Sequence, residues 1–407
     1  MTDDSIQKKQ VPKWLMFLLA ASCGLIVANL YYAQPLVGPI SKALGLSASF
    51  SGTIVTVTQI GYVIGLLFIV PLSDLVENRR LAVSILGVAV CALLMAGLTH
   101  HAGLFFAAAF LIGAGSVVAQ VLVPYAAYLS SKEEQGRAVG TVMSGLLLGI
   151  MFARPISSFL TGLFQWNVIF LLSAAIMLIL MILLTRLLPK RAPVKTLPYR
   201  KMIASLGPLF RATPVLRRRA LYQACLFCSF SLFWTVAPLW LAKHFGLSQT
   251  GIALFALVGV GGAAASPIAG RLADKGWSRK LTTLAFIIAA SSFALSHLFQ
   301  STPGLALVIF CIAGVLLDMS VSGNLVLGQQ AIYALGEQAR GRMNGMFMAV
   351  FFAGGAVGSA AGGWLFAQGG WNAASVFGMV MPLVALIYHL TDKVPSQQRA
   401  VQNALDV

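Results

Sequence analysis

Two charged side chains stand inside long apolar runs, where their type and position could do chemistry. Asp318 lies within CIAGVLLDMSVSG (311–323), and Arg154 lies within GIMFARPISSF (149–159). A charge at the centre of a membrane-spanning helix costs about 2.5–3.5 kcal/mol by insertion scales, so it is expected to serve a purpose. A buried carboxylate can bind and release a proton, and a guanidinium can pair with it. The sequence leaves open whether the two groups pair, and a static pair that only fixes packing is the alternative.

The composition places both charges in a membrane protein. The chain has 407 residues, of which 58% are hydrophobic and only 10% are charged, with a mean hydropathy of +0.87. Soluble domains carry about 25% charged residues. The apolar runs are continuous and do not alternate as strands of a membrane barrel would, so we predict an all-α membrane protein. The net charge of +17 does not indicate nucleic-acid binding, because the basic residues flank apolar runs.

Twelve apolar runs are long enough to be membrane-spanning helices. They cover residues 14–37, 50–72, 81–99, 103–129, 138–162, 166–187, 219–242, 250–270, 281–299, 304–331, 343–366 and 371–390. They divide the chain into a cytoplasmic N-terminus, a six-helix half, a basic cytoplasmic linker, a second six-helix half and a cytoplasmic tail, at 1–13, 14–187, 188–218, 219–391 and 392–407.

The basic residues predict the orientation of these helices. Of the 28 lysines and arginines, 25 fall in the termini, the linker and the connections on one side. The other side has only Lys42 and Lys243. Because lysine and arginine accumulate in cytoplasmic loops, both termini and the linker are expected to be cytoplasmic. The linker is expected to lie on anionic lipid headgroups, and a regulatory partner site is the alternative.

The two halves repeat each other at an offset near 200 residues. The matching pairs are Pro35-Leu36 and Pro238-Leu239, Gly45-Leu46-Ser47 and Gly246-Leu247-Ser248, Asp74 and Asp274, and Trp166-Asn167 and Trp371-Asn372. Their common order and spacing indicate an internal duplication. Arg154 falls opposite the uncharged Ser359, so the frame is duplicated but the buried charges are not. Because these charges are absent from the equivalent positions of the repeat, we infer that they serve a function and are not required by the duplicated fold.

The motifs GRLADKGWSRK (270–280) and PLSDLVENRR (71–80) follow the second helix of each half. With the duplication and the basic linker, they resemble the major facilitator superfamily. NLYYAQPL (29–36), ENRR (77–80) and GIMFAR (149–154) look most similar to a bacterial branch of drug and metabolite efflux permeases. The copy at 71–80 is preceded by Val70 where the family has glycine, and it has one extra residue before its arginines. The resemblance implies a gate at the cytoplasmic helix ends, formed by Asp74, Arg79, Arg80, Asp274, Arg279 and Lys280. The alternative is that these charges only set topology.

Polar residues within the spans are candidates for the substrate surface. The resemblance implies that helices one, four, seven and ten line the cavity, and Gln59 of helix two is a further candidate. The candidates are Asn29, Tyr31, Tyr32, Gln34, Gln59, Gln120, Tyr125, Tyr128, Trp234, Ser322 and Gln329. Hydrogen bonding between helices is the alternative role for each. Such a surface is typical of a site for an amphipathic organic solute. In helix five, Gly145 and Gly149 predict a close helix contact.

These features predict a proton-coupled transporter of the bacterial inner membrane. The expected activity is efflux of small amphipathic organic molecules by alternating access, with Asp318 and Arg154 coupling protons to transport. Import of a metabolite by proton symport is the alternative. A membrane enzyme is remote, since the five histidines are scattered and no phosphate-binding loop is present. We therefore predict no metal, no cofactor and no nucleic-acid partner, and a monomer whose partners are substrate, protons and lipid.

Overall fold

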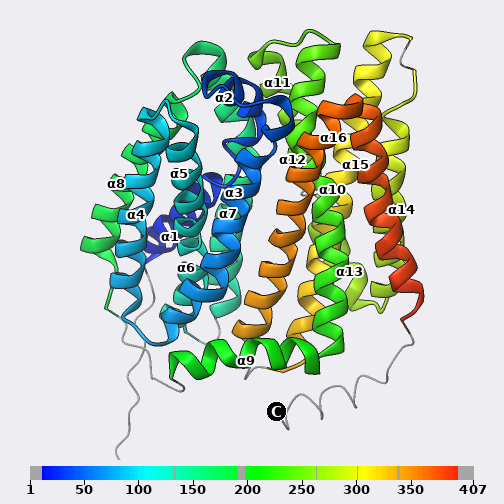
Figure 1. Ribbon diagram of the computed structural model, residues 1–407. Coiled ribbons are helices and arrows are strands. Elements are labelled where there is room, and N and C mark those ends of the chain that lie inside the picture. The colour runs from blue at the N-terminus through cyan, green and yellow to red at the C-terminus, as the bar shows by residue number, and fades with distance from the viewer. Residues whose placement is uncertain are drawn as a thin grey trace, which may run out of the picture.

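The computed structural model is a bundle of helices that stand roughly side by side, with one helix lying across its lower end (Figure 1). It describes residues 12–131, 134–190, 198–262, 264–299, 301–336 and 340–392. Within these ranges the chain forms helices and no strands. The predicted all-α membrane fold is therefore confirmed. Both predicted terminal segments lie almost entirely outside these ranges, as do residues 191–197 of the linker.

The N-terminal half runs from α1 to α8. Its α-helices are α1 (Lys13–Ala28), α2 (Val37–Ala43), α3 (Thr53–Ile64), α4 (Asn78–Leu98), α5 (Ala102–Gly115), α6 (Val118–Leu129), α7 (Gln135–Leu163) and α8 (Val168–Leu187). Short 3-10 or π segments occur at η1 (Gln34–Leu36), η2 (Ala48–Phe50), η3 (Gly65–Ile69) and η4 (Val70–Asp74). The first predicted span is thus broken between α1 and η1, near Pro35, which has no N–H to donate.

The C-terminal half runs from α10 to α16. Its helices are α10 (Pro214–His244), α11 (Gln249–Ala256), α12 (Val258–Gly262), α13 (Ala265–Asp274), α14 (Ser278–Leu295), α15 (Pro303–Tyr333) and α16 (Arg340–Leu390). The backbone leaves helical geometry inside α16 at Gly369 and Gly370, where Gly370 has φ 62°. Only glycine adopts such a φ without strain, so the chain turns there. The predicted boundary between the last two spans falls at this turn.

Nine helical stretches among the described residues are long and apolar enough to cross a membrane. The sequence predicted twelve spans, so three predicted spans are not among these nine stretches. Two correspond to the 16-residue α1 and the 18-residue α14. The third is the second arm of α16, whose 51 residues would extend about 76 Å as a straight helix, far beyond a bilayer core of about 30 Å.

Small residues of α7 bring its backbone against that of α1. A side chain at Gly149 would collide with the backbone of Gly24, and one at Gly145 would collide with the backbone of Ala20. The close contact predicted from these glycines is confirmed. The second half repeats it, because Gly354 of α16 packs on the backbone of Ala224 in α10.

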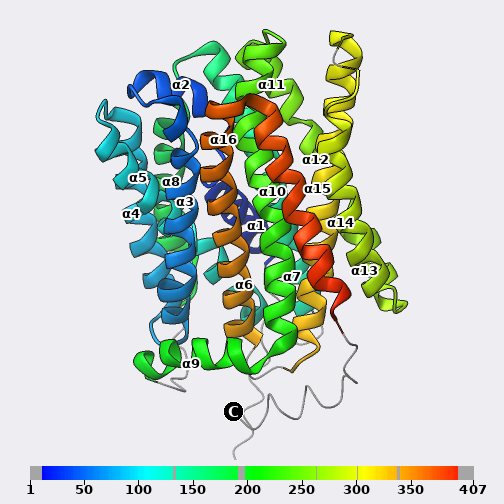
Figure 2. The same cartoon turned by 45° about the vertical axis from the view of Figure 1, so that its right-hand side comes forward.

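A helix that hydropathy does not predict, α9 (Tyr199–Ala212), crosses the lower end of both halves (Figures 1 and 2). Met202 and Leu206 are buried, whereas Arg200 and Lys201 are exposed. Tyr199 donates a hydrogen bond to the Phe68 carbonyl, 2.8 Å away. On the other half, Arg342 donates to Ser205 Oγ at 2.9 Å. The helix therefore contacts both halves from below.

Candidate functional site

Arg154 and Asp318 meet at the interface between the two halves. Arg154 comes from α7 and Asp318 from α15, and only 2% and 4% of their surfaces are exposed. Arg154 Nη1 lies 4.0 Å from Asp318 Oδ2. The structure thus answers the question that the sequence left open, and pairs the two intramembrane charges.

The Asp318 carboxylate is held by α10 and faces α12. Trp234 Nε1 donates to Asp318 Oδ1 at 2.8 Å. On the other side, a Cβ at Gly259 would lie only 2.9 Å from Asp318 Oδ2, and one at Gly262 would collide with the Asp318 Cβ. Two glycines of α12 therefore provide the space that lets this carboxylate sit between helices.

The Arg154 guanidinium is surrounded by aromatic rings. Its central carbon lies 4.3 Å from the ring centre of Trp234, 4.9 Å from that of Phe230 and 5.3 Å from that of Tyr31. A ring face attracts a cation, most strongly where water is excluded. Tyr31 and Trp234 are separated by the same 203 residues as Pro35 and Pro238. The two halves thus present equivalent aromatic residues to one asymmetric charge.

Two buried donors at this site have no hydrogen-bond partner among the described residues. Arg154 Nε donates to Gln34 Oε1 at 2.8 Å. Arg154 Nη2 and Gln34 Nε2 are buried without a partner in that part of the chain. Leaving a buried donor unpaired costs about 1–3 kcal/mol, and more for a charged group. These two donors are therefore available to a hydrogen-bond acceptor from a bound molecule.

A second polar contact links the halves near the first. Gln59 Nε2 of α3 donates to Ser231 Oγ of α10 at 2.9 Å. One turn before Gln59, Thr56 Oγ1 lies 2.8 Å from Ser359 Oγ of α16. On the other flank, Ser158 of α7 donates to the side chain of Gln249 at 3.0 Å. These contacts join the halves from mid-depth toward the end that carries α2 and α11.

The predicted substrate residues divide into those at this interface and those elsewhere. Tyr31, Gln34 and Trp234 surround Arg154, and Gln59 bridges the halves. The other candidates lie elsewhere. Three of them make hydrogen bonds: Asn29 accepts from Ser173 of α8, Gln120 donates to Tyr62, and Tyr125 donates to the Pro189 carbonyl. Of the rest, Tyr32 is buried, Ser322 and Gln329 are half-buried, and Tyr128 is exposed. Asn29 and Gln120 thus make the hydrogen bonds between helices that were the alternative role.

Sequence reasoning missed Phe230, Gly259 and Gly262, which all contact the buried pair. Phe230 is one of many phenylalanines in apolar runs, and nothing in its type distinguishes it. The glycines carried a usable signal, because VGVGG (258–262) concentrates small residues within one predicted span. Such a stretch indicates close approach of another element.

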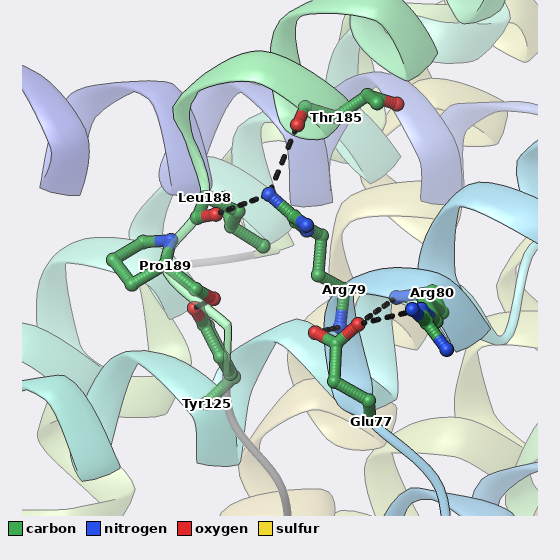
Figure 3. Close-up of polar contacts among 7 residues, drawn as sticks. All are labelled: Glu77, Arg79, Arg80, Tyr125, Thr185, Leu188 and Pro189. Carbon is green, nitrogen blue, oxygen red and sulfur yellow. Dashed lines mark hydrogen bonds and ion pairs between the residues drawn. The ribbon is translucent and has the colours of Figure 1, made fainter.

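The predicted gate residues lie at the lower end, near α9. Glu77 accepts hydrogen bonds from the backbone N–H groups of Arg79 and Arg80, and so caps the start of α4 (Figure 3). Arg79 donates to the carbonyls of Thr185 in α8 and of Leu188 just after α8, at 3.2 and 3.3 Å. Asp74 ends η4.

The gate residues of the other half also make contacts within their own half. Gln330 of α15 donates to Asp274 at 3.4 Å. Lys280 lies 5.4 Å from the ring centre of Trp277, and Arg279 stands in the first turn of α14.

Comparison with known proteins decides the family. The model of the major facilitator superfamily matches residues 16–336 and 220–405 of this chain. The chain belongs to the major facilitator superfamily. It is 39% identical over 375 residues to an uncharacterized transporter, YgaY, of Escherichia coli O157:H7, covering 92% of this chain and 94% of the relative. It is 30% identical over 357 residues to a probable transporter, SCO4007, of Streptomyces coelicolor, covering 87% and 82%.

A solved structure agrees with this superfamily fold. The chain matches a mutant form of the nucleoside transporter NupG with a TM-score of 0.74 and 13% sequence identity, over 92% of this chain and 99% of that chain. At this identity the match shows the fold alone. Together, the family and the relatives make this protein a multi-pass membrane transporter of the major facilitator type, rather than an enzyme.

Proposed function

We propose that the protein is a proton-coupled secondary transporter that exports small amphipathic organic molecules by alternating access. One observation carries the proposal, namely the buried contact of 4.0 Å between Arg154 and Asp318 across the two halves. A pair that bridges two moving bodies changes its geometry when they rock against each other. A carboxylate that loses its counter-charge in a water-poor site takes up a proton, and it releases that proton when the arginine returns. This cycle couples proton movement to the motion.

The substrate surface in this proposal is the interface around the pair. Tyr31, Gln34, Gln59 and Trp234 supply aromatic faces and amide groups there. A mostly apolar site with a few directed polar groups is typical of pockets for small organic molecules. The remaining candidates stay predictions that mutagenesis can test.

The proposed orientation places the α9 end in the cytoplasm of a bacterium. The exposed Arg200 and Lys201 on α9 suit anionic headgroups at that surface. Bacterial relatives and helical spans together favour the inner membrane, because outer-membrane proteins span as β-barrels. In this orientation, the contacts of Thr56 and Ser158 close the outer side, and the gate residues face the cytoplasm.

Import by proton symport is the second candidate function. The observation that favours it is that two buried donors at this site, Arg154 Nη2 and Gln34 Nε2, have no partner in the described part of the chain. If the substrate accepts hydrogen bonds from them, it competes with Asp318 for Arg154. Protonation of Asp318 would then promote substrate binding rather than oppose it, and the two would move together.

The test is proton movement in proteoliposomes that contain a pH-sensitive dye. Compounds that raise the thermal unfolding temperature of the purified protein are added on one side of the membrane. The wild-type protein is expected to move protons in response to such a compound, outward or inward according to the coupling. Asp318→Asn is expected to bind the compound and to move no protons. Proton movement by this variant at the wild-type rate would refute the proposal.

A further inference from the structure

A cavity lies beside the site, toward the end that carries α2 and α11. Its volume is about 290 Å³, and both halves line it: Pro35, Gly38 and Pro39 from the first half, and Pro238, Leu239, Ala242, Lys243 and Gln249 from the second. Each wall continues into the site below. Pro35 follows Gln34, and Pro238 stands one turn beyond Trp234 in α10. Ser158, one turn beyond Arg154 in α7, donates to Gln249. One turn is about 5.4 Å.

The charge at this end of the molecule has one sign. Lys42 and Lys243 are its only lysine or arginine residues, and the segments that join helices there contain no aspartate or glutamate. Both lysines are exposed and occupy the last turn of a helix. They are 201 residues apart, as are Gly45 and Gly246, which follow them with φ 65° and 63°. Lys243 lines the cavity, and its equivalent Lys42 follows Pro39 of the opposite wall by three residues. An anion is attracted to this end of the molecule.

The site below the cavity favours an anion over a cation. An organic cation would need the aromatic faces of Tyr31, Phe230 and Trp234, but the Arg154 guanidinium already lies against them. It would also meet that fixed positive charge. Arg154 Nη2 and Gln34 Nε2, which have no partner among the described residues, instead call for a group that only accepts hydrogen bonds. A carboxylate fits, because its two oxygens match the fork of a guanidinium.

We propose that the substrate is a small organic monoanion, whose carboxylate binds Arg154 and Gln34 and whose apolar body rests on the surrounding aromatic rings. The inference rests on the second candidate function given above, proton symport, and names its substrate class. Charge is conserved at the site. Arg154 and Asp318 sum to zero before binding, and Arg154, the bound anion and a protonated Asp318 also sum to zero. One proton taken up by Asp318 therefore accompanies each anion.

Among the described residues, few ionisable groups face Asp318. Arg154 from α7 and Tyr31 from the segment after α1 interact with it electrostatically. From α10 it meets the Trp234 N–H, and from α12 it meets Gly259 and Gly262. Of these, only the guanidinium carries a charge. A bound carboxylate that engages the guanidinium therefore removes the counter-charge of Asp318.

The first test measures binding of compounds that share a body and differ in charge. The probes are phenylacetate, 3-phenylpropionate and octanoate, each compared with the amine and the alcohol of the same carbon skeleton. Thermal unfolding of the full-length protein in detergent is followed at acidic and neutral pH. At least one carboxylate is expected to raise the unfolding temperature, more strongly at acidic pH, while its amine does not. Stabilisation by amines alone, or by no carboxylate, would overturn the inference.

Variants then locate the effect. Gln34→Glu keeps the size of the side chain and supplies Arg154 with a carboxylate, so it is expected to weaken binding of the carboxylate probe at least about tenfold. The matched control, Gln135→Glu, adds the same charge at the far end of α7 and is expected to leave binding unchanged. Equal affinity in Gln34→Glu and wild type would place the anion elsewhere and refute the site.

The cavity mouth is tested with Lys42→Gln combined with Lys243→Gln. This variant is expected to slow uptake of the carboxylate probe several-fold at low salt, whereas Lys201→Gln on α9 is not. An unchanged rate would exclude the lysine pair. Failure of this substrate class is distinguishable from failure of the proposed function. If amines or alcohols drive Asp318-dependent proton movement, the coupling stands and the anion assignment falls. If carboxylates bind at this site but move no protons, the anion assignment stands and the proposed proton coupling falls.

Discussion

At the scale of single residues, the buried pair is held by unequal sets of contacts. Asp318 accepts from Trp234 at 2.8 Å and lies 4.0 Å from Arg154. Arg154 makes one good hydrogen bond, to Gln34, and otherwise lies among rings. Removing one partner of a buried pair leaves an uncompensated charge, which costs more than removing both. The energetics of this pair can therefore be separated from its role in transport.

We expect Arg154→Gln to lower the free energy of unfolding by about 3–5 kcal/mol, because it leaves Asp318 buried without a counter-charge. The double variant Arg154→Gln with Asp318→Asn is expected to recover most of that loss. Unfolding in detergent micelles of the wild type, both single variants and the double variant forms a double-mutant cycle. Losses that simply add would mean that the contact of 4.0 Å contributes little to stability.

Sequence identified the two buried charges but not their surroundings. A lone acid and a lone arginine in apolar runs are visible without a structure, because such residues are rare there. Their contact joins helices from different halves, and no local pattern fixes which pairs meet. For the same reason, the sequence does not predict that Asn29 and Gln34, five residues apart, have partners in different parts of the molecule. Asn29 binds Ser173 inside its own half, whereas Gln34 binds Arg154 at the interface. A turn between α1 and η1 separates their directions.

At the scale of elements, hydropathy found the spanning runs but not how they break or what lies beside them. The turn at Gly369 and Gly370 was predicted, because Trp371 repeats Trp166. The helix α9 was not, because its apolar residues follow a helical period instead of forming a run. Helix contacts through glycine were predictable where two glycines share a face, as in α7. Packing of α1 against α7 positions Arg154, since it lies just beyond Gly149.

We expect Gly149→Ala to destabilise the protein by about 1–3 kcal/mol, because the added methyl group collides with the backbone of Gly24 and separates α1 from α7. The measurement is the thermal unfolding temperature in detergent. The control is Gly140→Ala on the same helix, where nothing lies within 4 Å of the added Cβ. Gly140→Ala is expected to be neutral or slightly stabilising, since alanine favours helix. Similar behaviour of the two variants would show that α1 yields to the methyl group.

At the scale of the whole molecule, side chains of the two halves meet directly toward the α2 and α11 end. Thr56 meets Ser359, and Ser158 meets Gln249 there. At the opposite end, α9 contacts both halves through Tyr199 and Ser205. Direct contacts such as those of Thr56 and Ser158 close one side of a carrier around its midplane site. Transport by alternating access would then require the contacts at the α2 and α11 end to separate in every cycle.

A disulfide between Thr56→Cys and Ser359→Cys tests that requirement, in a background where the five native cysteines are replaced. The hydroxyl oxygens are 2.8 Å apart, so an oxidant is expected to form the bond readily. The bond would hold the halves together at that end, and transport of a compound found by thermal stabilisation is expected to stop until a reductant is added. The control pair, Ala269→Cys with Gly323→Cys, places two Cβ atoms 3.6 Å apart within one half, and its disulfide should leave transport intact. Undiminished transport by the fully oxidised Thr56–Ser359 pair would mean that substrate passes without separation of α3 from α16, and that the motion lies elsewhere in the fold.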